Sequence, residues 1–192
     1  MDSKQIAIEI RLAIKKCNTE KVVELIGTNA ETLNMITPFG TWLHVAASRG
    51  ELDIVKKLLE LGSNINMLEG VNGGGALNEA ASSGHIDIVR YLLSCGANLD
   101  LDVSKPERNP LFGAISNGHV DLTKLLIESG IDTEVKYSGE SKKDMDALTF
   151  AMGQGQEEIV ELLENSKVWS TTTQQDRLML HYQVVLVNRG GK

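Results

Sequence analysis

Apolar residues recur along this chain in a two-part pattern that repeats at a nearly fixed interval. A short apolar run containing alanines is followed by a glycine, and then by a second run with apolar residues every three or four positions. The runs that begin at Leu43, Leu77, Leu111 and Leu148 are 34, 34 and 37 residues apart. A period in this range is typical of a solenoid, in which no unit buries its apolar face alone.

Each unit predicts two helices joined by a tight turn. In the clearest copy, residues 43–48 form the first apolar run, and Gly50 supplies the positive φ that a turn between two helices requires. Residues 52–59 follow with the spacing of an amphipathic helix, which Gly62 ends. The turn glycine recurs in the later copies as Gly84, Gly118 and Gly155.

These residues resemble the ankyrin repeat, with its Thr-Pro-Leu-His start, paired alanines, turn glycine and Leu-Leu-x-x-Gly end. The best copy matches at Gly40, Thr41, Leu43, His44, Ala46, Ala47, Gly50, Ile54, Val55, Leu58, Leu59, Gly62 and Asn66. An earlier copy is traced through Ala13, Glu20, Val22, Leu25 and Ile26, with Cys17 in place of the turn glycine.

The resemblance implies an all-α solenoid of about five stacked helix pairs with projecting β-turn fingers, a finger being the turn that precedes each first helix. The expected repeats are approximately 5–35, 36–69, 70–103, 104–140 and 141–165, within a repeat domain of residues 1–165. Residues 166–192 carry no repeat features and are expected to be a C-terminal cap, an interaction segment or a tail foreign to the native protein.

Two departures from the family pattern bear on function. Of the histidines that in the family tether neighbouring loops, this chain keeps only His44. The connector Val135–Asp146 makes its unit three residues longer, as the 37-residue interval shows. Such an insertion is either an enlarged binding finger or a loop that has drifted without a role.

Charge favours a protein partner with a basic surface. Residues 1–165 hold 15 basic and 25 acidic residues, a net charge of −10, whereas residues 166–192 have a net charge of +3. An acidic array repels nucleic acid, whose binding needs clustered cations, and would steer a basic protein surface toward it. The alternative is that acidity only aids solubility.

The histidines and motifs of this chain predict a protein that is not an enzyme. The four histidines lie far apart, and neither a phosphate-binding loop nor a nucleophile motif is present. We therefore expect no cofactor, no metal and no small-molecule substrate. No apolar run is long enough to span a membrane, and neither a secretory signal nor a disulfide framework is evident. The expected compartment is cytoplasmic, with Cys17 and Cys95 reduced.

The function we predict is a non-catalytic protein-binding module that inhibits its partner, because small acidic ankyrin proteins look similar to immunity proteins that neutralise a toxin. The alternative is a regulatory or adaptor subunit that scaffolds an enzyme or channel. The resemblance places partner contacts on fingers and first helices. The candidate residues are Trp42, Val45, Ser48, Arg49, Glu69, Asn72, Glu79, Ser82, Ser83, Lys105, Glu107, Arg108, Phe112, Ser116, Asn117, Lys142, Asp144 and Phe150.

Overall fold

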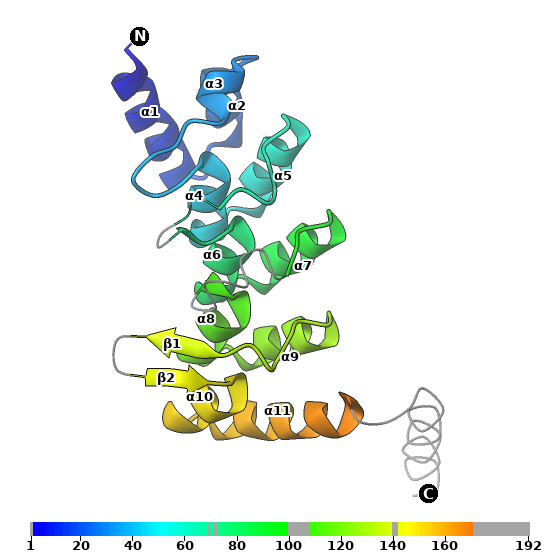
Figure 1. Ribbon diagram of the computed structural model, residues 1–192. Coiled ribbons are helices and arrows are strands. Elements are labelled where there is room, and N and C mark those ends of the chain that lie inside the picture. The colour runs from blue at the N-terminus through cyan, green and yellow to red at the C-terminus, as the bar shows by residue number, and fades with distance from the viewer. Residues whose placement is uncertain (1, 69, 71–72, 100–107, 140–141, 171–192) are drawn as a thin grey trace, which may run out of the picture.

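The helices of the computed structural model pair and stack in sequence order (Figure 1). The structure describes residues 2–68, 70, 73–99, 108–139 and 142–170. In this part, the pairs are α1 (Ser3–Lys15) with α2 (Thr19–Ile26), α4 (Trp42–Arg49) with α5 (Leu52–Glu60), α6 (Ala76–Ser82) with α7 (Ile86–Ser94), α8 (Pro110–Ser116) with α9 (Val120–Glu128), and α10 (Ala147–Gly153) with α11 (Glu157–Ser170). The predicted solenoid of five helix pairs is confirmed.

Two short additions interrupt this regular order. A one-turn helix, α3 (Ala30–Leu33), follows the first pair, and a hairpin of β1 (Tyr137–Gly139) and β2 (Lys142–Met145) precedes α10. The strands are antiparallel, with Tyr137 opposite Met145. The longer connector predicted from the 37-residue interval therefore contains a β-hairpin, which lies on the finger side of the stack (Figure 1).

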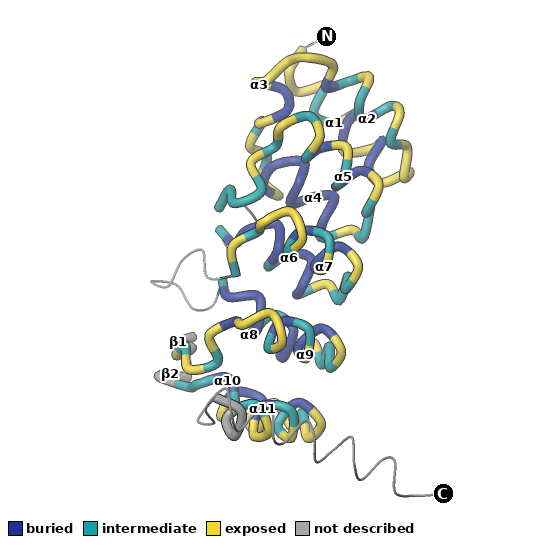
Figure 2. The backbone as a smooth tube through the Cα atoms, turned by 90° about the vertical axis from the view of Figure 1, so that its right-hand side faces the viewer, coloured by how far each residue is buried: buried dark blue, intermediate teal, exposed yellow. Residues whose placement is uncertain are grey.

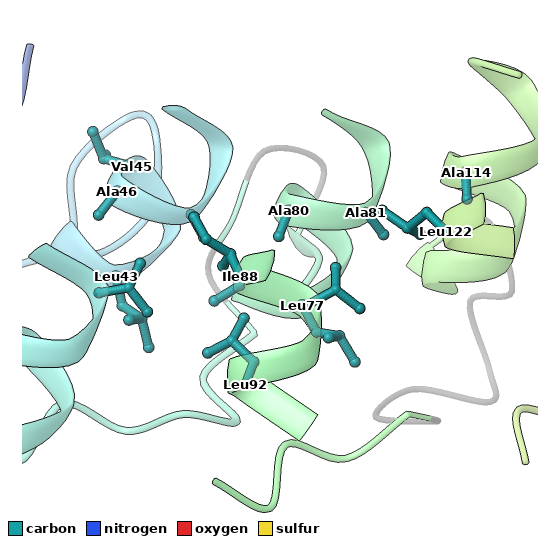
Figure 3. Packing of buried hydrophobic residues seen from close by; sticks show 14 of the residues in the cluster. Leu43, Val45, Ala46, Leu77, Ala80, Ala81, Ile88, Leu92, Ala114 and Leu122 are labelled. Atoms are coloured by element: carbon teal, nitrogen blue, oxygen red, sulfur yellow. The ribbon is translucent and has the colours of Figure 1, made fainter. Parts of the chain in front are cut away.

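The core is a continuous layer between the two columns of helices. Buried segments follow the inner faces of successive pairs, while exposed segments lie at the turns and on the outer helices (Figure 2). The labelled side chains in Figure 3 run from Leu43 to Leu122 across three units. Alanines such as Ala46, Ala80 and Ala114 have no exposed surface, and their small size lets neighbouring first helices approach closely.

Histidines join the third unit to the second and the fourth unit to the third. The Nε2 atom of His85 donates to the carbonyl oxygen of Ser48 at 3.1 Å, and that of His119 donates to the carbonyl oxygen of Ser82 at 3.3 Å. A carbonyl can only accept, so Nε2 carries the proton in both rings. These bonds satisfy carbonyl groups at the ends of α4 and α6 that have no partner within their own helices.

The turn of the first unit confirms the repeat alignment at its most divergent position. Cys17 has φ +54°, and no other non-glycine residue in the described chain has positive φ. It therefore adopts the conformation that glycine adopts in the later units, where Gly50 has φ +81°. The cost of a left-handed side-chain-bearing residue, about 1 kcal/mol, is tolerated at this end of the stack.

Three expectations concern the C-terminal end of the chain. The predicted domain boundary at 165 falls inside α11, which continues to Ser170, so the last helix is longer than the pattern predicted. Leu148, expected to be buried like Leu77, is only half-buried. The described residues provide no sixth pair to cover it. Of the predicted cap or tail at 166–192, residues 166–170 belong to α11 and residues 171–192 lie outside the described residues.

The inter-unit contact at Gly50 predicts a difference between two glycines of similar backbone conformation. A Cβ atom at Gly50 would lie 2.7 Å from Cε1 of His85, whereas at Gly62, with φ +96°, it would meet nothing within 4 Å. We expect Gly62→Ala to lower the free energy of unfolding by about 1 kcal/mol through backbone strain alone. Gly50→Ala should cost about twice that, because it also displaces the His85 ring and its hydrogen bond.

Urea unfolding followed by circular dichroism measures both costs. Adding His85→Ala to Gly50→Ala removes the clash, so the two changes together should cost less than the sum of their separate effects. If Gly50→Ala and Gly62→Ala lowered the free energy of unfolding equally, the His85 ring would not control the spacing of the units. The same would follow if the effects of Gly50→Ala and His85→Ala were strictly additive.

Candidate protein-binding surface

The first helices α4, α6 and α8 carry a row of polar residues, all small except Asn117 and the long cation Arg49, on the finger side of the stack. We call this the polar row; it occupies the last positions of each helix and its C-cap, and recurs with the 34-residue period. Its members are Ser48, Arg49, Ser82, Ser83, Ser116 and Asn117. Arg49, Ser83, Ser116 and Asn117 are exposed. The Oγ atoms of Ser48 and Ser83 lie 3.5 Å apart, so the row is continuous from α4 to α6.

Trp42 does not belong to this exposed surface, although it was among the candidate binding residues. Its side chain is 1% exposed, and its Nε1 donates to the carbonyl oxygen of Thr32 at 2.7 Å. The indole replaces the proline of the family pattern and joins α4 to α3 beneath the surface. Trp42 is thus a packing residue in this structure, and a partner cannot reach it without opening the stack.

Phe112 and Phe150 are also buried rather than exposed, at 2% and 4%. Their rings meet edge to face, with centroids 5.4 Å apart, a geometry that aromatic pairs favour. Phe112 stands where the family has its tethering histidine, so an aromatic contact between α8 and α10 replaces a polar one. The expectation that Phe112 and Phe150 contact a partner is contradicted by their burial in this structure.

His44, by contrast, makes the tether that its place in the pattern predicted. Its Nδ1 accepts from the backbone N–H of Thr41 at 3.2 Å, and its Nε2 donates to the carbonyl oxygen of Met67 at 2.9 Å. The ring therefore closes the N-terminus of α4 and holds the start of the next finger.

Several candidates at the finger tips cannot be placed. Glu69, Asn72, Lys105 and Glu107 lie outside the described residues, and of Lys142 and Asp144 only the backbone, in β2, is described. Arg108 is described and half-buried. A Cβ atom at Gly73 would lie 2.5 Å from its guanidinium carbon, so Arg108 lies against the preceding finger instead of projecting from its own.

A groove of about 480 Å³ lies between α1, the finger before α4, and the surfaces of α4 and α6. Its lining is Ile8, Arg11, Leu12, Lys15, Phe39, Val45, Ser48, Arg49 and Glu79. Val45 and Glu79, two of the candidate residues, are 7% and 9% exposed, so neither projects from the surface. We call this the α1 groove; it continues directly into the polar row through Ser48 and Arg49.

The α1 groove is apolar at its rim and positively charged. Ile8, Leu12 and Phe39 are 53%, 47% and 42% exposed, and they are three of the five large apolar side chains that are exposed in the described chain. The guanidinium carbon of Arg11 lies 3.9 Å from the centroid of the Phe39 ring, a cation–π contact that holds both side chains at the edge of the groove.

The contribution of α1 to this surface was not predicted, although the sequence contains a signal for it. A helix that buries one face should have apolar residues on that face only. In α1 the buried residues Ile10 and Ile14 define the core face, but Ile8 and Leu12 form a second apolar pair four residues apart. A second apolar stripe on a terminal helix indicates another surface to be covered.

The comparison with family models decides the classification. The model described as Ankyrin repeats (3 copies) matches residues 10–103 and 99–176, which is most of the chain. This chain belongs to the ankyrin-repeat family. No curated protein matches it.

Each histidine in the described part of this ankyrin array makes a structural hydrogen bond. The rings of His44, His85 and His119 all bond to main-chain carbonyl oxygens. Within the described residues, no group of three or more His, Cys, Asp or Glu side chains is placed to hold a metal ion. No helix there is both long and apolar enough to cross a membrane.

Both cysteines are free thiols at the surface. The Sγ atom of Cys17 donates to Oε1 of Glu51 at 3.1 Å. This hydrogen bond to a carboxylate, with smaller contributions from desolvation and from the negative charge of Glu51, raises the pKa of the Cys17 thiol, against an opposing effect of Arg49. A higher pKa means a smaller fraction of the reactive thiolate at a given pH.

This contact predicts how Cys17 responds to alkylation. The variant Glu51→Gln removes the carboxylate charge, so the pKa of Cys17 should fall and its reaction with iodoacetamide near pH 8 should become faster by a few-fold. Rates are measured by quenched labelling and peptide mass spectrometry. The rate at Cys95 in the same samples is the internal control and should not change. An unchanged or slower rate at Cys17 would contradict the assigned contact.

Proposed function

We propose that this protein is a binding module that uses the finger side of its stack to occupy and inhibit a partner protein. The observation that carries the proposal is the polar row, which repeats at equivalent positions over three units while the residues beneath it are buried. Ankyrin repeats are in general protein-interaction modules, so membership of the family supports the same conclusion. Inhibition would follow from such binding, because a stack lying across a partner blocks access to the surface it covers.

We infer that the partner is a toxin-like or enzymatic protein, which this chain neutralises by occupying its surface. The support for this class is the resemblance to small acidic inhibitors and the net charge of −10 over residues 1–165. Such a charge accelerates association with a basic surface and makes the association rate depend on salt.

The proposed face predicts which substitutions weaken partner binding. Arg49→Ala and Asn117→Ala truncate exposed members of the polar row in two different units and should each weaken binding by about 1 kcal/mol or more if they are anchors. Neither should alter stability by more than about 0.5 kcal/mol. Matched controls are Arg90→Ala on α7 and Lys57→Ala on α5, both exposed on the outer column.

The measurement begins with tagged protein in extract of the native host, and the variants are compared by quantitative mass spectrometry of what is captured. Affinity for the identified partner is then measured by calorimetry, and inhibition by titrating the partner's own activity. If the outer-column variants lost binding while Arg49→Ala and Asn117→Ala bound normally, the proposed binding face would be the wrong one. Normal partner activity at saturation would refute inhibition while leaving the binding face intact.

A further inference from the structure

The α1 groove has a chemistry opposite to that of the molecule around it. Three of its lining residues are cations, namely Arg11, Lys15 and Arg49, and one is the carboxylate Glu79. The surrounding array has a net charge of −10 over residues 1–165. In the described chain, no carboxylate lies within ion-pairing distance of these three cations. The groove therefore favours anionic groups where the rest of the array repels them.

The groove also exposes apolar side chains to water. Ile8 and Leu12 lie one helical turn apart on α1, and Phe39 faces them from the finger before α4. Their exposed fractions are near one half, so an occupant must cover the outward side of the rim as well as fill the space. Small ligands are usually 70–90% enclosed by their pockets. An open apolar rim is better suited to a segment of a protein.

The backbone around the groove favours a helix over an extended strand. Strand addition needs main-chain N–H and C=O groups that are free to pair. Here α1, α4 and α6 use theirs within helices, and in the finger the N–H and C=O of Thr37 pair with those of Gly40. No open strand edge lines the groove in the described residues. An amphipathic helix needs only side-chain contacts and lays its apolar face into such a groove.

We propose that the α1 groove docks an acidic amphipathic helix of the partner protein, with its apolar face on Ile8, Leu12 and Phe39 and its carboxylates beside Arg11, Lys15 and Arg49. This proposal rests on the proposed function and specifies the chemistry of one partner segment. Docking removes the apolar rim from water, which stabilises the complex. The three cations select a helix with negative charge and fix its orientation in the groove. Glu79 is the one carboxylate of the lining, and at 9% exposure it presents little of its charge to an occupant.

The test uses the full chain and a pair of synthetic probes. Both are fluorescein-labelled peptides of about 14 residues, four helical turns, with leucines at helical spacing. The polar positions are shared between glutamines and charged residues, which are Glu in one probe and Lys at the same positions in the other. Fluorescence anisotropy at low salt should show the Glu probe binding at least about tenfold more tightly than the Lys probe. Added salt should weaken the binding.

Four variants locate the binding site of the Glu probe. Leu12→Ser, at an exposed position, should weaken binding about tenfold, and the double change Arg11→Glu with Lys15→Glu should reverse the preference between the probes. The matched controls are Lys4→Glu, an exposed cation of α1 outside the groove, and Met152→Ser, an apolar residue 61% exposed on α10. Both should bind the probe within about twofold of the unsubstituted protein. Circular dichroism verifies folding of each variant.

Each contrary outcome overturns the proposal, and the preference of the unsubstituted protein tests it without any variant. Equal or tighter binding of the Lys probe refutes the assigned charge, and equal effects of groove and control variants refute the assigned place. A dimer that Leu12→Ser converts to a monomer in light scattering would give the groove to a second copy of this chain. If neither probe binds, but capture of the partner from extract still depends on Asn117, which lies outside the groove, then the proposed function stands and only the docking of an acidic helix is refuted.

Discussion

The structure depends on how closely the turn of one unit can approach the next. At Gly50 the space that a Cβ atom would occupy is filled by the His85 ring, and at Gly84 by that of His119. In both places the ring then bonds to a carbonyl oxygen at the end of the preceding first helix. The missing side chain and the hydrogen bond are thus parts of one contact. It fixes the distance between units, and the paired alanines of the first helices fit that distance.

This contact also determines which surface is available for recognition. Because the rings bond to the carbonyl oxygens of Ser48 and Ser82, the ends of the first helices are held in register from unit to unit. The side chains at those ends consequently form a regular row, although each belongs to a separate helix. The position of the proposed binding face is therefore a consequence of the packing, whereas its chemistry is free to vary.

The period of the sequence predicted the helix pairs because it records the packing directly. Leucines, alanines and glycines recur where neighbouring units touch, and Cys17 could be assigned to a turn because it stands at a glycine position. The fates of Trp42, Phe112 and Phe150 could not be predicted in the same way. A repeat pattern says which positions face the next unit on average, but whether a large ring fits there depends on the particular residues opposite. Trp42 finds the carbonyl of Thr32, and Phe112 finds Phe150.

The same distinction explains why net charge misdescribed the local surface. A sum over 165 residues weights every charge equally, whereas a bound segment feels mainly those within a Debye length, about 8–10 Å at physiological salt. The groove gathers Arg11 and Lys15 from one unit with Arg49 from the next, a juxtaposition that only the stacking creates.

The polar row and the α1 groove can therefore contribute differently to one interface. The small side chains of the row offer little apolar area and can mainly set register through hydrogen bonds. The groove combines the aromatic ring of Phe39 with arginines, and aromatic and arginine anchors usually carry much of the energy of an interface. An acidic array can thus steer a basic surface toward it from a distance and still hold an acidic helix at one end. The two attractions act over different ranges and on different parts of a partner, so together they favour a partner whose own charge is unevenly divided.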